Sequence, residues 1–286
     1  MRKQGYRFNV SSTIDLHCHT TASDGKLTPA ELIAKAQERN ITTLAITDHD
    51  TLAGFREAKP YAEQAGINLI SAIEVSTVWG GANIHIVGLN IDENHPTILE
   101  AETYQKKVRI NRAEVIAQRL GKRLNHEIDM DEIRSYTQDG QIGRPHFAQY
   151  LLKHELISTF AEAFNKYLGA GKIGDVKTGW PDIPTAVQWI TEAGGIAVFA
   201  HGHHYKMTRT KLRACVSDFV EAGGRAIEVA YGLMDNSQQQ KMVRIAEDFD
   251  LLGSCGSDYH GPNRFGLELG TMTAFPEGIT PVWETF

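Results

Sequence analysis

The sequence predicts an α/β fold in which short strands alternate with helices and form a largely parallel sheet, closed or nearly closed into a (β/α)7-type barrel. Two observations support this prediction. Seven short runs rich in β-branched and apolar residues are spread along the chain, and several are followed by segments with helix start and stop signals. A third observation adds an exception: one long internal stretch has no clear strand, which predicts a helical insertion.

The seven runs that we predict as strands cover residues 13–16, 43–46, 68–73, 83–89, 196–200, 226–229 and 251–254. Capping residues predict the helices between them. Thr28 can cap a helix that has Pro29 at its first position, and Glu31 completes a capping box. This helix is expected to end near residues 39–40 and the next one at Gly66. Later helices are expected at about 184–194, 210–222 and 236–249.

The insertion is predicted at residues 93–180, so that residues 13–92 and 181–286 form the barrel. Within it, helical stretches are expected at about 100–124, 147–152 and 160–168. The insertion holds 13 Lys and Arg against 12 Asp and Glu, a net charge of +1, which leaves −7 for the rest of a chain of net charge −6. Basic residues dominate residues 104–126, where they form either a solvated face or a phosphate-facing lid.

Composition and charge exclude several classes of protein. The net charge of −6 provides no bulk basic field for nucleic acid. Three cysteines without CxxC spacing indicate a reducing compartment rather than a disulfide framework. Residues 1–12 are polar and lack the apolar core of a signal peptide, and no run of about 18 apolar residues is present. A cytoplasmic protein without a membrane span is therefore expected.

Histidines and carboxylates accompany most of the predicted strands. His17 and His19 alternate along the first strand and therefore point the same way, with Cys18 turned to the other face. The other strands and strand ends carry Asp24, His49, Glu74, His85, His201, Asp258 and His260. Because the C-terminal strand ends of a parallel barrel lie on one face, we expect these side chains to converge.

This set of side chains predicts a metal site. Neutral imidazoles combined with carboxylates suit divalent Mn, Fe or Zn. The number of ligands is too large for one ion and predicts two or three, which is a recurrent arrangement in phosphoryl hydrolases. Asp48 and Asp50 flank His49 and are expected to orient its imidazole.

The motifs that carry these ligands resemble those of a known family. They are Asp15-Leu16-His17-Cys18-His19, Asp24-Gly25, Thr47-Asp48-His49-Asp50, Glu74, His85, His201 and Gly256-Ser257-Asp258-Tyr259-His260. In this order they resemble the PHP (polymerase and histidinol phosphatase) family of metal phosphoesterases, over nearly the whole chain. The resemblance implies a distorted (β/α)7-type barrel and three divalent ions, with Mn²⁺ first and Fe²⁺ or Zn²⁺ as alternatives.

The resemblance also implies a role for each ligand. One ion would be held by His17, His19, Glu74 and Asp258, a second by Glu74, His85 and His201, and a third by Asp24, His49 and His260. Glu74 would bridge two ions, because a carboxylate has two oxygen atoms. Glu74, His201 and Asp258 would be the catalytic residues among these ligands.

Residues 84–89 and the helical insertion look most like one branch of the family, which includes 3′,5′-nucleoside bisphosphate phosphatases and a related 5′→3′ exoribonuclease. The resemblance therefore implies that the chain releases the 3′-phosphate from nucleoside 3′,5′-bisphosphates and trims short 5′-phosphorylated RNA. Arg144 and His146 match a motif that contacts substrate phosphate in this branch. His201-Gly202-His203-His204 departs from the branch, which has His-Pro and then Arg. His203 and His204 would be either weaker phosphate donors or exposed loop histidines.

Two other functions are compatible with the same ligands. A histidinol-phosphate phosphatase uses the same metal chemistry, although the insertion and its basic helix argue against it. A non-catalytic metal-binding accessory module is the second alternative, although the complete ligand set argues against it. The expected partner is a nucleoside bisphosphate or short RNA substrate. No DNA, membrane or obligatory protein partner is expected.

Overall fold

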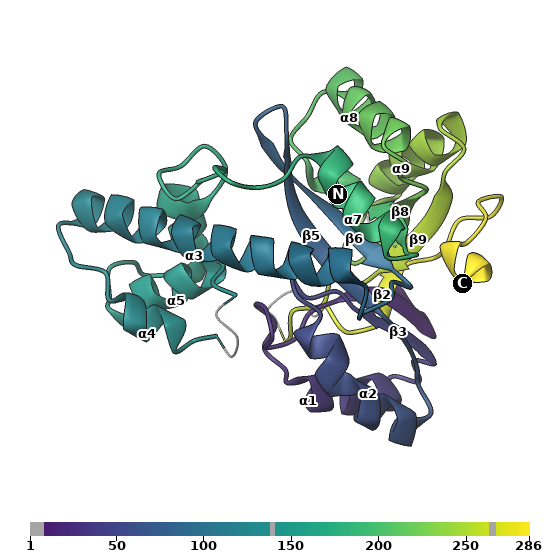
Figure 1. Ribbon diagram of the computed structural model, residues 1–286, viewed down its shortest axis with the longest axis horizontal. Helices are drawn as coiled ribbons and strands as arrows, with labels where there is room; N and C mark the ends of the chain where they lie inside the picture. The colour runs from purple at the N-terminus through teal and green to yellow at the C-terminus, as the bar shows by residue number, and fades with distance from the viewer. Residues whose placement is uncertain (1–8, 138–140, 263–266) are drawn as a thin grey trace, which may run out of the picture.

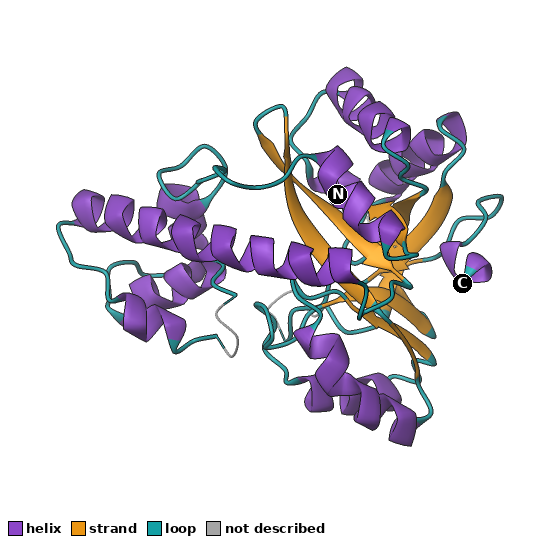
Figure 2. Cartoon of the chain, viewed as in Figure 1, coloured by secondary structure: helices purple, strands orange, loops and turns teal. Residues whose placement is uncertain are grey.

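The computed structural model describes residues 9–137, 141–262 and 267–286. Two sheets form the centre of the molecule, helices cover them, and a helical segment projects to one side (Figure 1 and Figure 2). The N-terminal segment that was predicted to lack a signal peptide lies mostly outside the described residues. Within the described ranges, no helix is both long enough and apolar enough to cross a membrane.

The first sheet is parallel and has the order β2-β3-β4. Its elements are β2 (Ile14–Cys18), α1 (Pro29–Glu38), β3 (Thr43–Ile46), α2 (Ala53–Ala65) and β4 (Asn68–Ile70). The capping box predicted for α1 is present, because Thr28 accepts from the backbone of Glu31 and the Glu31 side chain binds the Thr28 backbone. Helix α2 ends at Gly66, whose φ of 67° lies in the left-handed region that glycine adopts at low cost.

The second sheet has the order β5-β6-β7-β8-β9. Its strands are β5 (Ala72–Trp79), β6 (Ala82–Leu89), β7 (Ile196–Phe199), β8 (Ala226–Tyr231) and β9 (Leu252–Gly256). The helices that pack on it are α7 (Ile183–Glu192), α8 (Arg209–Glu221) and α9 (Asn236–Asp248), close to the predicted ranges. A further antiparallel pair, β1 (Asn9–Ser11) with β10 (Thr271–Thr273), has no counterpart in the sequence-based prediction.

The prediction of a closed, largely parallel barrel is not confirmed, because the described strands form three separate sheets and β6 runs antiparallel to both of its neighbours. The reason lies in the link between β5 and β6. Only Gly80 and Gly81 separate these strands, and both have positive φ values, 52° and 75°. Such a pair forms a tight hairpin turn, whereas a parallel connection needs a dozen or more residues.

The two main sheets nevertheless face each other across a buried apolar layer. Its members include Leu16 and Ala45 from the first sheet and Val87 and Val198 from the second. Isolated bridges join the sheets where they approach, from Cys18 to Tyr259 and from His49 to Glu74. Both bridges involve residues at the ends of the strands, where the predicted ligands lie. The sheets therefore hold the two halves of the site together.

The helical segment has a hydrophobic core of its own. It contains α3 (Pro96–Leu124), α4 (Met130–Arg134), α5 (Arg144–Lys153), α6 (Phe160–Ala163) and the π-helix η1 (Phe164–Leu168). Helix α3 begins four residues earlier than predicted, because the His95 ring accepts from the backbone of Thr97 at its start. Ile98 packs with the core of the second sheet and Ile116 with the core of the segment. Helix α3 thus connects the two cores (Figure 1).

Candidate metal centre

The structure brings the predicted ligands together at one end of the two sheets. His17 lies on β2 and His19 just after it, His49 follows β3, Glu74 lies near the start of β5, and His201, Asp258 and His260 follow β7 and β9. His85 belongs to the cluster, but its strand runs in the opposite direction to the one predicted. It lies near the beginning of β6, and because β6 runs antiparallel, its first residues are at the same end as the C-terminal ends of its neighbours.

Glu74 is at the centre of the cluster and is almost fully buried. Five imidazole nitrogens lie within 3.4 Å of its oxygens, those of His17, His19, His49, His85 and His201. His85 and His201 approach Oε1, at 2.8 and 2.9 Å, whereas the other three approach Oε2. Burial favours the protonated acid, but the histidines hold the pKa of Glu74 well below its usual range. The carboxylate is therefore ionised, and each of its oxygens faces imidazole nitrogens.

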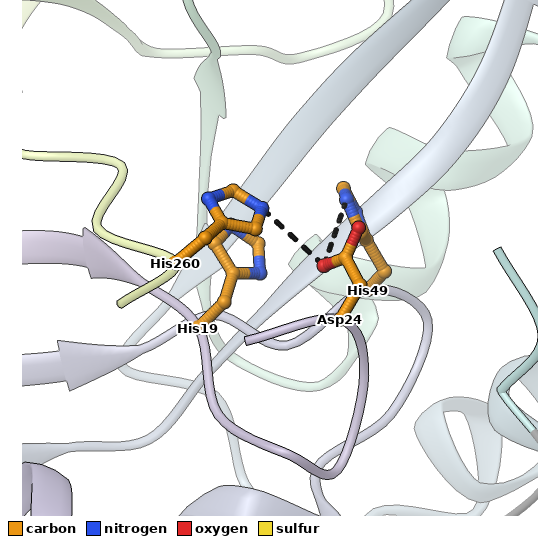
Figure 3. Close-up of side chains that lie close together, drawn as sticks. All are labelled: His19, Asp24, His49 and His260. Carbon is orange, nitrogen blue, oxygen red and sulfur yellow. Dashed lines mark ion pairs between the residues drawn. The ribbon is translucent and has the colours of Figure 1, made fainter. Parts of the chain in front are cut away.

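Side chains gather into three overlapping groups whose ligand atoms lie within 4.8 Å of one another. These groups are His17, His19 and Glu74; His49, Glu74 and His85; and His19, Asp24, His49 and His260. Figure 3 shows the last group, in which Asp24 Oδ1 lies 3.3 Å from His260 Nε2 and 3.8 Å from His49 Nε2. Asp258 Oδ1 lies 3.1 Å from His19 Nε2 and 3.4 Å from His17 Nε2, which places it beside the first group.

Several polar atoms in this cluster have no hydrogen-bond partner among the described residues. They include His17 Nε2, Asp24 Oδ1, His49 Nδ1 and Glu74 Oε2. Buried polar atoms normally have a hydrogen-bond partner. A group of such atoms that face one another without partners therefore indicates a binding site for a ligand or ion. Imidazole nitrogens and carboxylate oxygens are the donors that divalent Mn, Fe and Zn bind. The residues present therefore fit divalent metal ions.

A buried carboxylate supports this centre from the strand behind it. Glu228 Oε1 accepts from His17 Nδ1 at 2.5 Å, and Oε2 accepts from the backbone N–H of His201 at 2.5 Å. The bond to Nδ1 fixes the tautomer of His17 and leaves its Nε2 free as a ligand atom. Sequence reasoning gave Glu228 no role. The available signal was a carboxylate inside an otherwise apolar strand, because a buried charge needs a partner.

Two further groups position ligands at the other edge of the cluster. Tyr231 donates its hydroxyl hydrogen to Asp258 Oδ2, which turns Oδ1 toward His17 and His19. Asp24 and Asp258 also change the pKa of His260. Burial opposes protonation of His260, but these two carboxylates raise its pKa to about 10. Without a metal ion, His260 is therefore protonated at neutral pH.

Asp48 and Asp50 do not orient His49 in the way that was predicted. Asp48 accepts from the backbone and hydroxyl of Thr20 and from the hydroxyl of Ser23, which fixes the loop that carries Asp24. The φ of Asp50 is 59°, and its carboxylate binds the backbone of Ser76 and two side chains of α3, Gln105 and Arg109. Asp50 therefore ties the helical segment to the metal centre.

A cavity of about 120 Å³ adjoins the metal ligands on the side of the helical segment. Asp24, His49 and His85 line one wall, and Arg109, Arg112, Arg144 and Trp180 line another. Arg109 and Arg112 lie over the Trp180 ring, at 5.4 and 5.5 Å from its centroid. Burial and the nearby Arg144 and Arg109 lower the pKa of Arg112 to about 9. Three close guanidinium groups repel one another and favour a bound anion.

The two residues of the predicted phosphate motif have different surroundings. Arg144 lines the cavity, and its Nη1 donates to the Leu168 carbonyl at 3.1 Å. His146 lies two residues further along α5 and is buried, and its Nδ1 accepts from the backbone N–H of Gly143. That bond fixes the start of the helix from which Arg144 projects.

The unusual histidines after β7 form the short 3-10 helix η2 (Gly202–His204). His203 is half-buried, and both of its ring nitrogens lack a partner among the described residues. Burial lowers the pKa of His203 to about 3, so its ring is neutral. His204 is exposed, and its ring stacks at 6.0 Å from that of His201, a predicted ligand. The rings of His203 and His204 also lie beside that of Tyr231, with centroid distances of 4.7 and 5.1 Å.

Comparison with known proteins places this site in a family. The PHP domain family matches residues 15–175. A 5′-3′ exoribonuclease of Haemophilus influenzae is 43% identical, over 97% of this chain and 100% of its own. A 3′,5′-nucleoside bisphosphate phosphatase of Chromobacterium violaceum is 36% identical, over 95% of this chain and 95% of its own.

Two solved structures have a similar fold. A structure described as an amidohydrolase from Chromobacterium violaceum has a TM-score of 0.88 and 36% identity, and the match covers 96% of this chain and 95% of that chain. A structure described as a metal-dependent phosphoesterase from Bifidobacterium adolescentis has a TM-score of 0.79 and 28% identity, with coverage of 90% and 91%.

Proposed function

The chain belongs to the PHP domain family and is a phosphoric ester hydrolase, and we propose that it acts on nucleoside 3′,5′-bisphosphates and on short 5′-phosphorylated RNA. From the bisphosphates it would release the 3′-phosphate, and it would shorten RNA from the 5′ end. Both substrates carry a phosphate that is cleaved at the 3′ side of a nucleoside and a second phosphate at the 5′ side of the same nucleoside.

The observation that carries this proposal is the position of the arginine cavity directly beside the histidine cluster. His49 and His85 belong to both, so a ligand can reach the cluster and the arginines together. A guanidinium binds phosphate through two parallel hydrogen bonds. The cavity is thus suited to hold the phosphate that is not cleaved, while the scissile group lies at the metal centre. Anchoring the substrate at both ends reduces the entropy lost on reaching the transition state.

For the metal centre we propose three divalent ions, with Mn²⁺ the first choice and Fe²⁺ or Zn²⁺ as alternatives. His17, His19, Glu74 and Asp258 would hold one, Glu74, His85 and His201 a second, and Asp24, His49 and His260 a third. Bound ions of this kind lower the pKa of water and neutralise charge on a phosphoryl group.

The residues of the chain then have distinct tasks. Glu74 is ionised and offers one oxygen to each side of the cluster, and Glu228 holds the ring of His17 and the backbone of His201 in place. Tyr231 holds Asp258 in the orientation in which it faces His17 and His19. We propose that residues 93–180 act as a substrate-binding insertion, because α3 and α5 supply Arg109, Arg112 and Arg144.

A phosphate-release screen with Mn²⁺ tests the proposal directly. The panel contains a nucleoside 3′,5′-bisphosphate, the matching 3′- and 5′-monophosphates, histidinol phosphate and a 5′-phosphorylated oligoribonucleotide whose shortening is followed on a gel. We expect the bisphosphate and the RNA to be hydrolysed far better than the others. Preference for histidinol phosphate would instead assign that phosphatase activity, and no hydrolysis of any substrate would favour the accessory-module alternative.

A further inference from the structure

A second cavity lies on the side of the metal centre away from the insertion. It has a volume of about 380 Å³ and is bounded by η2 and the facing sides of α8 and α9. Helices α8 and α9 follow β7 and β8, so both begin at the end of the sheet that carries the ligands. Figure 1 places this helix pair and the helical segment on different sides of the sheets. We call this cavity the α8–α9 groove.

The rim of the α8–α9 groove is basic. Arg209 on α8 and Lys241 and Arg244 on α9 are exposed, and none of them forms an ion pair with a described residue. Arg213 also lines the groove and is paired with Asp248. The N-termini of both helices face the same end, and their partial positive charge adds to that of the side chains. This cluster of cations contrasts with a chain whose net charge is −6.

The floor of the groove is apolar. Leu212 and Met242 contribute from the two helices, together with Met207 and Tyr205 from the loop after η2. Unpaired cations around an apolar floor match the chemistry of a nucleotide, in which a charged phosphate is linked to a ribose and a flat base. Single-stranded nucleic acid is generally bound in this way, with the backbone on basic side chains and the bases on apolar or aromatic ones.

One end of the groove lies next to a predicted ligand in the sequence. Gly202 and His203 form its near end and directly follow the predicted ligand His201. Both ring nitrogens of His203 are buried and lack a partner among the described residues. The arginine cavity opens from the other flank, through His49 and His85. A strand that enters the arginine cavity with its 5′-phosphate and crosses the metal centre would thus continue into the groove.

We propose that the α8–α9 groove binds the nucleotides on the 3′ side of the scissile phosphodiester in an RNA substrate. This inference rests on the proposed function and extends it. A bisphosphate ends at the metal centre and does not reach the groove, whereas an oligonucleotide does. The groove therefore contributes to RNA cleavage and leaves bisphosphate hydrolysis unchanged.

The test is a double substitution of two exposed rim residues, Arg209→Gln with Lys241→Gln. Its matched control is Lys211→Gln, an exposed cation on α8 that does not line the groove. We expect the double variant to lose on the order of tenfold in kcat/KM on a 5′-phosphorylated hexaribonucleotide, since two phosphate contacts are removed. Activity on the bisphosphate should stay within twofold of that of the unaltered enzyme, and the control should match the unaltered enzyme on both substrates. Equal activity of the double variant and the control on the hexamer overturns the proposal.

A binding measurement separates the groove from the proposed activity. The anisotropy of a labelled, 5′-phosphorylated oligoribonucleotide is followed with the full chain in EDTA at several salt concentrations. Each lost phosphate contact reduces the slope of log K against log salt by about 0.7 for a single strand, so the double variant should show a slope smaller by about 1.4. An unchanged slope overturns the proposal that the α8–α9 groove binds RNA, even if the enzyme is active. A reduced slope without any hydrolysis supports the groove and refutes the proposed function.

Discussion

Replacing Arg144 with alanine should lower kcat/KM for a nucleoside 3′,5′-bisphosphate far more than for a substrate with one phosphate. Its two neighbours already bind protein groups, Arg109 through several of its nitrogen atoms and Arg112 through one. Arg109 is committed to Asp50, with its Nη2 at 2.6 Å from Oδ2, and to the Ser76 hydroxyl. Arg112 donates its Nε to the Val176 carbonyl. The structure gives Arg144 one bond, from Nη1 to the Leu168 carbonyl, which leaves its other N–H groups facing the cavity.

The size of the effect follows from the contact that is lost. A charge-assisted pair of this kind, partly shielded from water, accounts for about 2–4 kcal/mol of transition-state stabilisation. That corresponds to a decrease of about 30- to 900-fold in kcat/KM on the bisphosphate. Arg144→Lys should recover only part of it, because an ammonium group cannot bind phosphate through two parallel bonds.

The assay compares the bisphosphate with p-nitrophenyl phosphate, which has no second phosphate and should be hydrolysed almost normally. Arg119→Ala is the control, because this exposed arginine lies on α3 outside the cavity and also donates to a backbone carbonyl. Equal losses on both substrates would indicate a damaged metal centre. Unchanged activity on both would refute the phosphate-binding role of Arg144.

Three further predictions concern the metal centre and its link to the insertion. Glu74→Gln should reduce the metal content from about three ions to about one, measured by elemental analysis, because Glu74 belongs to two of the three ligand groups; an unchanged content would show that it bridges nothing. Binding of Mn²⁺ at pH 7.5 should release protons from the histidine cluster, one of them from His260, whose pKa nearby carboxylates raise to about 10, because a histidine ligand must be neutral. Calorimetry in buffers of different ionisation enthalpy measures this release, which His260→Gln should reduce by about one proton. Asp50→Ala should lower the free energy of unfolding in urea by about 3–5 kcal/mol, because Arg109 stays buried without its partner. Asp131→Ala, which removes an exposed ion pair, should cost less than about 1 kcal/mol.

Local signals in the sequence were sufficient to predict most helices and the side chains that converge at the candidate metal centre. The capping box at Thr28 and the left-handed Gly66 predicted where helices begin and end, because these signals act within a few residues. Strand alternation predicted that His17 and His19 point the same way, and the histidines and carboxylates of the other strands predicted that both belong to a metal site. The hairpin at Gly80-Gly81 was not predicted from the sequence, although the glycine pair indicates one. The predicted strand at residues 68–73 stops before Glu74, whereas β5 continues to Trp79, next to the turn.

Other features depend on contacts that a sequence does not reveal. Glu228 binds His17, which is 211 positions away in the chain, so its role becomes visible only when β8 and β2 are placed in space. The left-handed backbone at Asp50 sends its carboxylate to α3, and simple adjacency to His49 suggested a different partner. The direction of a side chain at a single turn residue is decided by tertiary contacts, since its local preferences are weak.

Asp15 has a consequence for the time at which this enzyme can become active in the cell. Its buried carboxylate accepts from the backbone of Ser257 and of Gly270, so the first strand of the site is completed by the last quarter of the chain. His17 and His19 likewise meet Asp258 only across some 240 positions. In a growing chain on the ribosome, His17 and His19 lack these contacts until Asp258 has been synthesised. Contacts this distant in sequence form late. A growing chain therefore cannot complete its metal centre before Gly270 has been synthesised, and the phosphoesterase remains inactive until then.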